Sequence, residues 1–294
     1  MVAAMLGVHR PKVHRFQLGA FEITTILDGA FALDNLKPPF CMDQEVSEIE
    51  ALAAANFVPA QPFEHTFTLT IVNTGDQLVL FDTGFGPVRR GTGAGYLREL
   101  LPEAGYKPED IDVVAFTHVH PDHIAGVREG DDLAFPNARY VIGQREFDEW
   151  KSGANIPEQR GENRDMFMRL VVPLADNMTF LQPDQDVVTG IKAVASFGHS
   201  LGHMSYLVER EGKSCLIWGD VTNHYVFSLQ RPEWGVAFDD DPVQATETRK
   251  RILDMTATDK LLVVGFHMPF PGIGYVELLN GVHRWVPASY QIRL

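Results

Sequence analysis

Three imidazoles and one carboxylate lie within the segment HVHPDH, at positions 118–123. The segment follows an apolar run, residues 111–116, whose lack of polar alternation predicts a strand covered on both faces. His118 and His120 share one face of an extended chain, whereas Asp122 and His123 follow a proline bend. One ion cannot easily bind all four side chains. A single structural zinc would favour cysteine ligands, so two neighbouring metals that serve hydrolysis are the better interpretation.

Three further candidate ligands follow later apolar runs that predict strands: His199, Asp220 and His267. His199 belongs to the motif GHSLGH at positions 198–203. Together with the first four residues they supply five imidazoles and two carboxylates, a donor set that suits zinc and also tolerates Mn, Fe or Co. A water that bridges two such ions loses its proton near neutral pH, and this hydroxide is the expected nucleophile.

Local patterns predict the elements that must hold these residues. Residues 13–31, with Gly19-Ala20 and Asp28-Gly29, predict a hairpin or meander, and residues 65–81 predict a hairpin. Helices are expected at 97–101, 144–151 and 244–255, and further strands at 139–142, 191–196, 204–208, 214–218 and 261–266. The glycine-rich stretch 91–95 lacks the P-loop lysine and predicts a mobile surface loop. Without a linker between its halves, the chain predicts one α/β domain spanning 1–294.

Composition narrows the class of protein. The 294 residues carry a net charge of −14, which opposes binding to nucleic acid and to anionic membranes. A chain of this length buries enough surface to need no metal merely to stay folded. Cys41 and Cys215 are far apart in apolar surroundings and predict buried free thiols. Because no apolar run is long enough to cross a bilayer and the first residues lack a positive leader, we expect a cytoplasmic protein.

The order HxHxDH, GHxxGH, GD and a late histidine resembles that of the metallo-β-lactamase-fold hydrolases. The resemblance implies a four-layer αβ/βα sandwich. It also implies that one metal is held by His118, His120 and His199, that the other is held by Asp122, His123 and His267, and that Asp220 bridges both, which makes Asp122 and Asp220 the catalytic carboxylates. Asp82 is similar to the family's aspartate that orients a ligand histidine, and His203 is expected beside the metals in a supporting role.

Within the family, the chain resembles the branch of methyl parathion hydrolase and the lactonases, in Gly219-Asp220 and in residues 270–275 and 284–290. The resemblance implies hydrolysis of a lactone or an organophosphate triester, and it suggests a homodimer. The ligand set has no cysteine and includes Asp220, which disfavours true β-lactamases, and His120 stands where diiron flavoproteins have glutamate. A glyoxalase II-like thioesterase remains the alternative, although little chain follows His267 for its helical extension.

Aromatic residues near the motifs predict an apolar substrate pocket. Its expected walls are Trp150, Phe167, Phe197, Phe266 and Phe270. No Arg or Lys clusters with the ligand motifs, so we expect a neutral, apolar ester as substrate. Lactonases commonly carry a tyrosine three residues after the bridging aspartate, but Asn223 occupies that position and the nearest tyrosine is Tyr225. The donor that stabilises the oxyanion is therefore left unassigned.

Residues 198–202 also match the nucleophile elbow G-x-S-x-G of serine α/β-hydrolases, with Ser200 as nucleophile. Asp220 and His267 follow in the order that this mechanism requires. An elbow needs a helix directly after the serine, however, and residues 204–208 alternate like a strand. This interpretation also leaves the histidines of 118–123 without a task. A metal-binding module without activity is a further alternative, but it would need no bridging aspartate and no open coordination position.

Overall fold

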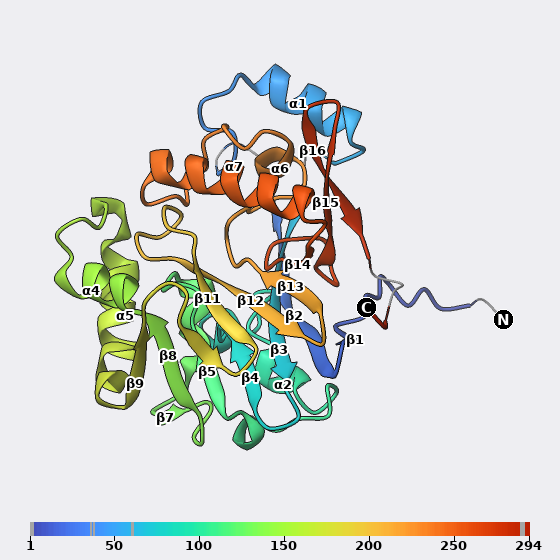
Figure 1. The fold of residues 1–294 in the computed structure, drawn as a ribbon. Helices are drawn as coiled ribbons and strands as arrows, with labels where there is room; N and C mark the ends of the chain where they lie inside the picture. The colour runs from blue at the N-terminus through green and yellow to red at the C-terminus, as the bar shows by residue number, and fades with distance from the viewer. Residues whose placement is uncertain (1–2, 36, 38, 60–61, 289–291) are drawn as a thin grey trace.

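The computed structural model describes residues 3–35, 37, 39–59, 62–288 and 292–294. Two seven-stranded sheets form its centre (Figure 1). The first has the order β1 (Val13–Leu18), β2 (Phe21–Leu33), β3 (Phe63–Asn73), β4 (Leu78–Phe81), β5 (Val113–Ala115), β8 (Arg139–Gly143) and β9 (Met178–Leu181). The second has the order β10 (Asp186–Val188), β11 (Ile191–Ala195), β12 (Met204–Arg210), β13 (Lys213–Ile217), β14 (Leu262–Val264), β15 (Ile273–Leu279) and β16 (Val282–Pro287).

The remaining elements are a small ribbon and the helices. The ribbon pairs β6 (Arg128–Glu129) with β7 (Asp132–Leu133). The α-helices are α1 (Val46–Ala55), α2 (Leu97–Leu100), α3 (Pro121–Ile124), α4 (Gln144–Ser152), α5 (Gly161–Leu170), α6 (Phe227–Gln230) and α7 (Pro242–Thr258). Short 3₁₀ turns lie at Gly86–Val88, Pro108–Asp110, Ala125–Val127, Glu158–Arg160 and Val172–Asn177. No helix of the described residues is long and apolar enough to cross a membrane.

Apolar cores separate four layers. Val113 and Ala115 of β5 face the second sheet, whereas Val114 between them faces the helices. Because all three are fully buried, β5 is the strand covered on both faces that its sequence predicts. The far side of the first sheet packs on α2, α4 and α5, and the far side of the second packs on α7 through Ile252 and Leu253. This is the expected four-layer αβ/βα sandwich.

The hairpin at the N-terminus differs from its prediction in one respect. Its turn lies at Gly19-Ala20, but Asp28-Gly29 forms a bulge inside the thirteen-residue strand β2. The buried Asp28 carboxylate accepts hydrogen bonds from the backbone N–H groups of Phe85, Gly95 and Leu97, and Ala94 is fully buried. Ala94 and Gly95 are therefore packed against β2, whereas Gly91 and Thr92 are exposed, so the stretch is a surface loop that is anchored at one end.

The other predicted strands and helices appear with ends shifted by a few residues. Helix α7 starts at Pro242, where Asp241 caps it by accepting from the N–H of Gln244. Both Cys41 and Cys215 are buried free thiols, as predicted. Of the segment 284–290 that resembles the lactonase branch, Ser289 and Tyr290 lie outside the described residues.

Candidate metal centre

The candidate ligands lie on loops that leave both sheets at one end. In the first sheet β4 and β5 are parallel neighbours, so the loop with Asp82 and the segment 118–123 emerge side by side. In the second sheet β13 and β14 are parallel, which brings Asp220 close to His267. The turn between β11 and β12 adds His199. Residues that are far apart in the chain thus meet because parallel strands end at a common edge.

Seven side chains form two donor groups. The ligand atoms within each group all lie within 4.8 Å of one another. The three-histidine group contains His118, His120 and His199, and the mixed group contains Asp122, His123, Asp220 and His267. All seven residues are those whose motifs imply metal binding in the sequence.

Asp220 contacts both groups. Its Oδ2 lies 3.3 Å from Nε2 of His199 and 3.0 Å from Nε2 of His267, and its Oδ1 lies 3.4 Å from Nε2 of His123. Asp122 contacts two histidines of the mixed group, with its Oδ2 3.5 Å from Nε2 of both His123 and His267. This geometry suits a carboxylate that bridges two cations.

Unpartnered atoms test whether cations fit this site. His118 Nε2, His123 Nε2 and Asp220 Oδ1 are buried, and none of these atoms has a hydrogen-bond partner among the described residues. Leaving such atoms unpaired costs about 1–3 kcal/mol each. Two divalent ions would satisfy them, and imidazole with carboxylate donors suits zinc and related metals. The residues therefore fit a pair of divalent cations.

Two residues hold ligands of the mixed group in place. Asp82 Oδ2 lies 2.8 Å from Nδ1 of His123, and the same carboxylate accepts from the backbone N–H and the hydroxyl of Thr117. His203 Nε2 accepts from the backbone N–H of Asp220 at 3.0 Å, so its Nδ1 carries the hydrogen toward Ser196. Such contacts fix which nitrogen of a ligand histidine faces the metal and how the bridging carboxylate is turned.

Two adjacent aspartates, which the sequence interpretation missed, hold the three-histidine group. Asp239 Oδ1 lies 3.0 Å from Nδ1 of His199, and Asp240 Oδ2 lies 3.1 Å from Nε2 of His120. Arg249 pairs with Asp239 at 2.8 Å, and Arg160 pairs with Asp240 at 2.7 Å.

These arginines keep both aspartates charged. Burial by itself would raise the pKa of Asp239, but Arg249 and His199 lower it below its usual value. In the same way, His120 and Arg160 overcome the effect of burial and lower the pKa of Asp240. In the sequence the two residues stand in an acidic run before Pro242 that is typical of a helix cap, and no signal marks them as partners of ligands.

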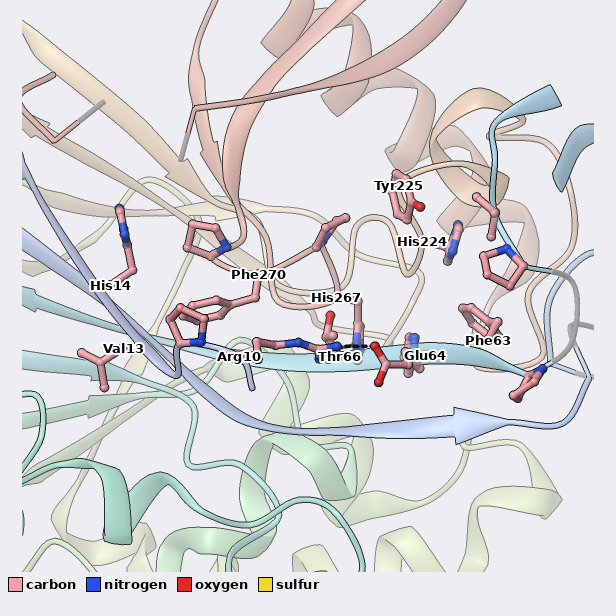
Figure 2. A pocket seen from close by; sticks show the side chains of 17 residues that line it. Arg10, Val13, His14, Phe63, Glu64, Thr66, His224, Tyr225, His267 and Phe270 are labelled. Atoms are coloured by element: carbon pink, nitrogen blue, oxygen red, sulfur yellow. Dashed lines mark hydrogen bonds and ion pairs between the residues drawn. The ribbon is translucent and has the colours of Figure 1, made fainter. Parts of the chain in front are cut away.

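A cavity of about 740 Å³ opens beside the mixed group. Figure 2 shows His267 on its wall, with Thr66 from β3, Phe270 from the loop after β14, and His224 and Tyr225 from the loop before α6. Val13, Val58, Phe63 and several prolines make other walls apolar. An ion pair between Arg10 and Glu64 lies among the lining residues.

Of the predicted pocket walls, Phe270 lines this cavity and the other four do not belong to its described lining. Trp150 and Phe167 are fully buried in the core beside the first sheet, because the apolar face of α4 and of α5 turns inward. Phe197 lies under the guanidinium of Arg145, 4.5 Å from its ring centroid. Phe266 stacks on the ring of His123 at 4.0 Å. Four of the five aromatic residues that the sequence predicts as pocket walls thus lie outside the described lining of this cavity.

Three histidines without any predicted role line the cavity, namely His14, His65 and His224. The ring of His65 stacks on that of His267, with centroids 4.2 Å apart. His224 Nδ1 accepts from the N–H groups of Val226 and Phe227, so the hydrogen resides on Nε2. Burial, with a smaller effect of His267, lowers the pKa of His224 to about 3, and the ring stays neutral near pH 7. None of these three histidines has the spacing of a ligand motif, which is why the sequence did not mark them.

Ser200 does not belong to a catalytic triad. Its hydroxyl donates to Glu146 and accepts from Nε1 of Trp150, and among the described residues it contacts no histidine side chain. The chain enters strand β12 after the serine loop, where an elbow would require a helix. The serine-hydrolase alternative is therefore wrong.

Comparison with known proteins supports the metallo-β-lactamase class that the sequence motifs resemble. The family profile described as "Metallo-beta-lactamase superfamily" matches residues 67–267, and the chain belongs to this superfamily. It is 27% identical over 168 residues to an N-acyl homoserine lactonase of Bacillus cereus, and 24% identical over 169 residues to one of Bacillus thuringiensis. Each match covers 57% of this chain and 60% of the relative, so the chain spans somewhat more than half the length of these lactonases.

Solved structures extend the likeness over almost the whole chain. AidC, a dizinc quorum-quenching lactonase in complex with a product, superposes with a TM-score of 0.88 at 26% identity, covering 95% of this chain and 98% of AidC. The hydrolase AbOPH of the beta lactamase superfamily superposes with a TM-score of 0.87 at 26% identity and the same coverage.

Proposed function

We propose that this chain is a dinuclear metal-dependent hydrolase that opens lactones bearing an apolar acyl chain, such as N-acyl homoserine lactones. The observation that carries the proposal is the pair of donor groups sharing Asp220 beside an apolar cavity. The relatives named as lactonases support the choice of substrate.

The bound cations would polarise the ester oxygen under attack and lower the pKa of a water, so that a nucleophile is available near neutral pH. The residues of this chain then have separate tasks. Asp220 holds the two donor groups at a fixed separation, and Asn223 Nδ2 donates to its Oδ2 at 3.1 Å. His224 presents Nε2–H as a permanent donor, because two backbone N–H groups occupy its other nitrogen. It is suited to hydrogen-bond an ester oxygen in the cavity.

The charges around the cavity favour a neutral substrate. Arg10 is the one Lys or Arg among the described lining residues, and Glu64 pairs with it. An anionic substrate, such as a glutathione thioester or a phosphodiester, would find no free cationic side chain there. A neutral lactone or an aryl phosphotriester meets no such cost, and the apolar walls offer contact for its hydrocarbon part.

A substrate panel with metal removal tests the proposal. Chelation should abolish hydrolysis of acyl homoserine lactones, readdition of Zn, Mn or Co should restore it, and serine-directed fluorides should have no effect. Asp220→Asn should lower kcat/KM by orders of magnitude. The matched control is Asp148→Asn, an exposed position on α4. Full activity of the metal-free protein would contradict a metal-dependent hydrolase, and a panel led by phosphotriesters or by glutathione thioesters would contradict the lactone assignment.

A further inference from the structure

Glu146 is a buried acid that no motif marked. It lies in the first turn of α4 and is fully buried. Its Oε1 accepts from the backbone N–H of Val119 at 3.0 Å and from the hydroxyl of Ser200 at 2.6 Å, and its Oε2 accepts from the backbone N–H of Gly202 at 2.8 Å. All three partners are donors, so the carboxylate satisfies them with its two oxygens.

These three donors belong to the two loops of the three-histidine group. Val119 stands between His118 and His120, and Ser200 follows His199 directly. One carboxylate therefore ties together the backbones of loops that lie about eighty residues apart in the chain.

The same face of α4 supports the loops at a second point. Trp150 follows Glu146 by four residues and so lies on the same side of the helix. Its Nε1 donates to Ser200 at 2.8 Å, and its ring packs edge-on to that of His120, with centroids 5.7 Å apart. A Cβ at Gly202 would lie 2.1 Å from the backbone nitrogen of Glu146, so the serine loop approaches the helix as closely as glycine permits.

We propose that Glu146, braced by Ser200, is a positioning residue that sets the spacing of the three-histidine group and thereby the affinity of that group for its divalent ion. The inference rests on the proposed function, because it takes the two groups to bind metal. The proposal also assigns a role to Ser200, the serine of the GHSLGH motif. The hydroxyl anchors the carboxylate that joins the two loops, and it takes no part in nucleophilic attack.

Stepwise zinc binding, measured by chelator competition on the full chain, tests the proposal. Glu146→Gln replaces one acceptor oxygen by an NH₂ group that faces donors, so at least one loop loses its bond. We expect the affinity of one of the two zinc steps to fall about 10–100-fold, as is usual when a partner of a ligand is lost. The other step should be unchanged. Asp122→Asn assigns the steps, because it removes a donor of the mixed group only.

Two further variants make the result specific. Glu149→Gln is the matched control on the same helix, and its carboxylate accepts from Asn155, away from both loops. Ser200→Ala removes the hydroxyl but leaves both backbone N–H donors in place, so it should weaken the same zinc step by a smaller factor. It also tests the proposal if Glu146→Gln fails to fold.

Equal zinc affinities in wild type, Glu146→Gln and Ser200→Ala would overturn the role of Glu146 while leaving the proposed function intact. Equal weakening of both steps would also overturn it, because it would indicate a general loss of structure. A wild-type protein that binds no divalent metal would overturn the proposed function, and this inference with it.

Discussion

The free energy of unfolding should depend on pH in part through the ionisation of one buried carboxyl group, that of Glu146. Burial raises the pKa of Glu146 from 4.5 to about 7, although Ser200, Gly202 and Val119 oppose this shift by hydrogen bonding to the charged form. The folded protein therefore holds this proton more tightly than the unfolded chain does. Because the native state binds more protons between these two pKa values, the free energy of unfolding must fall as the pH rises through that window.

The two pKa values give the size of the effect. Each pKa unit corresponds to 1.36 kcal/mol, so the shift from 4.5 to about 7 is equivalent to about 3 kcal/mol. The stabilisation from the bound proton is complete below pH 4.5 and is lost by about pH 7.

Urea unfolding of the metal-free protein in chelator, from pH 4.5 to pH 8, measures this term. Glu146→Gln cannot ionise, so the unfolding free energy of wild type minus that of the variant should decrease by about 3 kcal/mol up to pH 7 and then stay level. Taking this difference removes the contribution of the histidines common to both proteins. Ser200→Ala should move the upper end of the window to higher pH, because it removes a bond that favours the charged form. A difference that is flat or that increases with pH would refute the reasoning.

Three other substitutions test residues of the candidate site and residues of the surrounding fold separately. Asp82→Asn should weaken zinc binding at the mixed group about 10–100-fold in chelator competition, because the acceptor that orients His123 changes, and an unchanged affinity would contradict this role. Phe270→Ala should raise KM for long-chain lactones more than it lowers kcat, whereas Phe167→Ala, away from the cavity, should leave KM unchanged and destabilise the fold by about 3–5 kcal/mol. Asp28→Ala leaves three buried N–H groups unpaired and should cost at least about 3 kcal/mol in urea unfolding, and a smaller loss would mean that water replaces the carboxylate.

The two donor groups were predictable because their chemistry is visible in the types and spacing of their residues. Imidazoles at positions 118, 120 and 123 are rare as core residues, and a buried strand before them indicates where the chain leaves a sheet. The fold followed from the same motifs through the resemblance they carry. The ends of the strands and the bulge at Asp28-Gly29 were harder to predict from the sequence. Asp-Gly is typical of a turn, but here the carboxylate of Asp28 accepts hydrogen bonds from three N–H groups of residues that are distant in sequence.

The partners of the ligands could not be predicted in the same way. Asp239, Asp240 and Glu146 are ordinary acidic residues in sequence, and only tertiary packing places them against His199, His120 and the two ligand loops. Trp150, in contrast, has a residue type that suggested a role in the substrate pocket, but it lies in the core. An aromatic residue that is close to a site in sequence can form a pocket wall or pack in the core. Trp150 packs in the core because it lies on the buried face of α4.

The partners also distribute charge unevenly between the two donor groups. On the side of the three-histidine group, Arg249 and Arg160 offset Asp239 and Asp240. In and beside the mixed group, the carboxylates of Asp82, Asp122 and Asp220 form ion pairs only with histidines among the described residues. Two divalent ions would thus bring four positive charges against three uncompensated carboxylates, and a hydroxide nucleophile would balance the remaining charge. On attack the negative charge would pass to the oxygen of a neutral ester, where the cations would stabilise it without the need for a free cationic side chain in the described cavity wall.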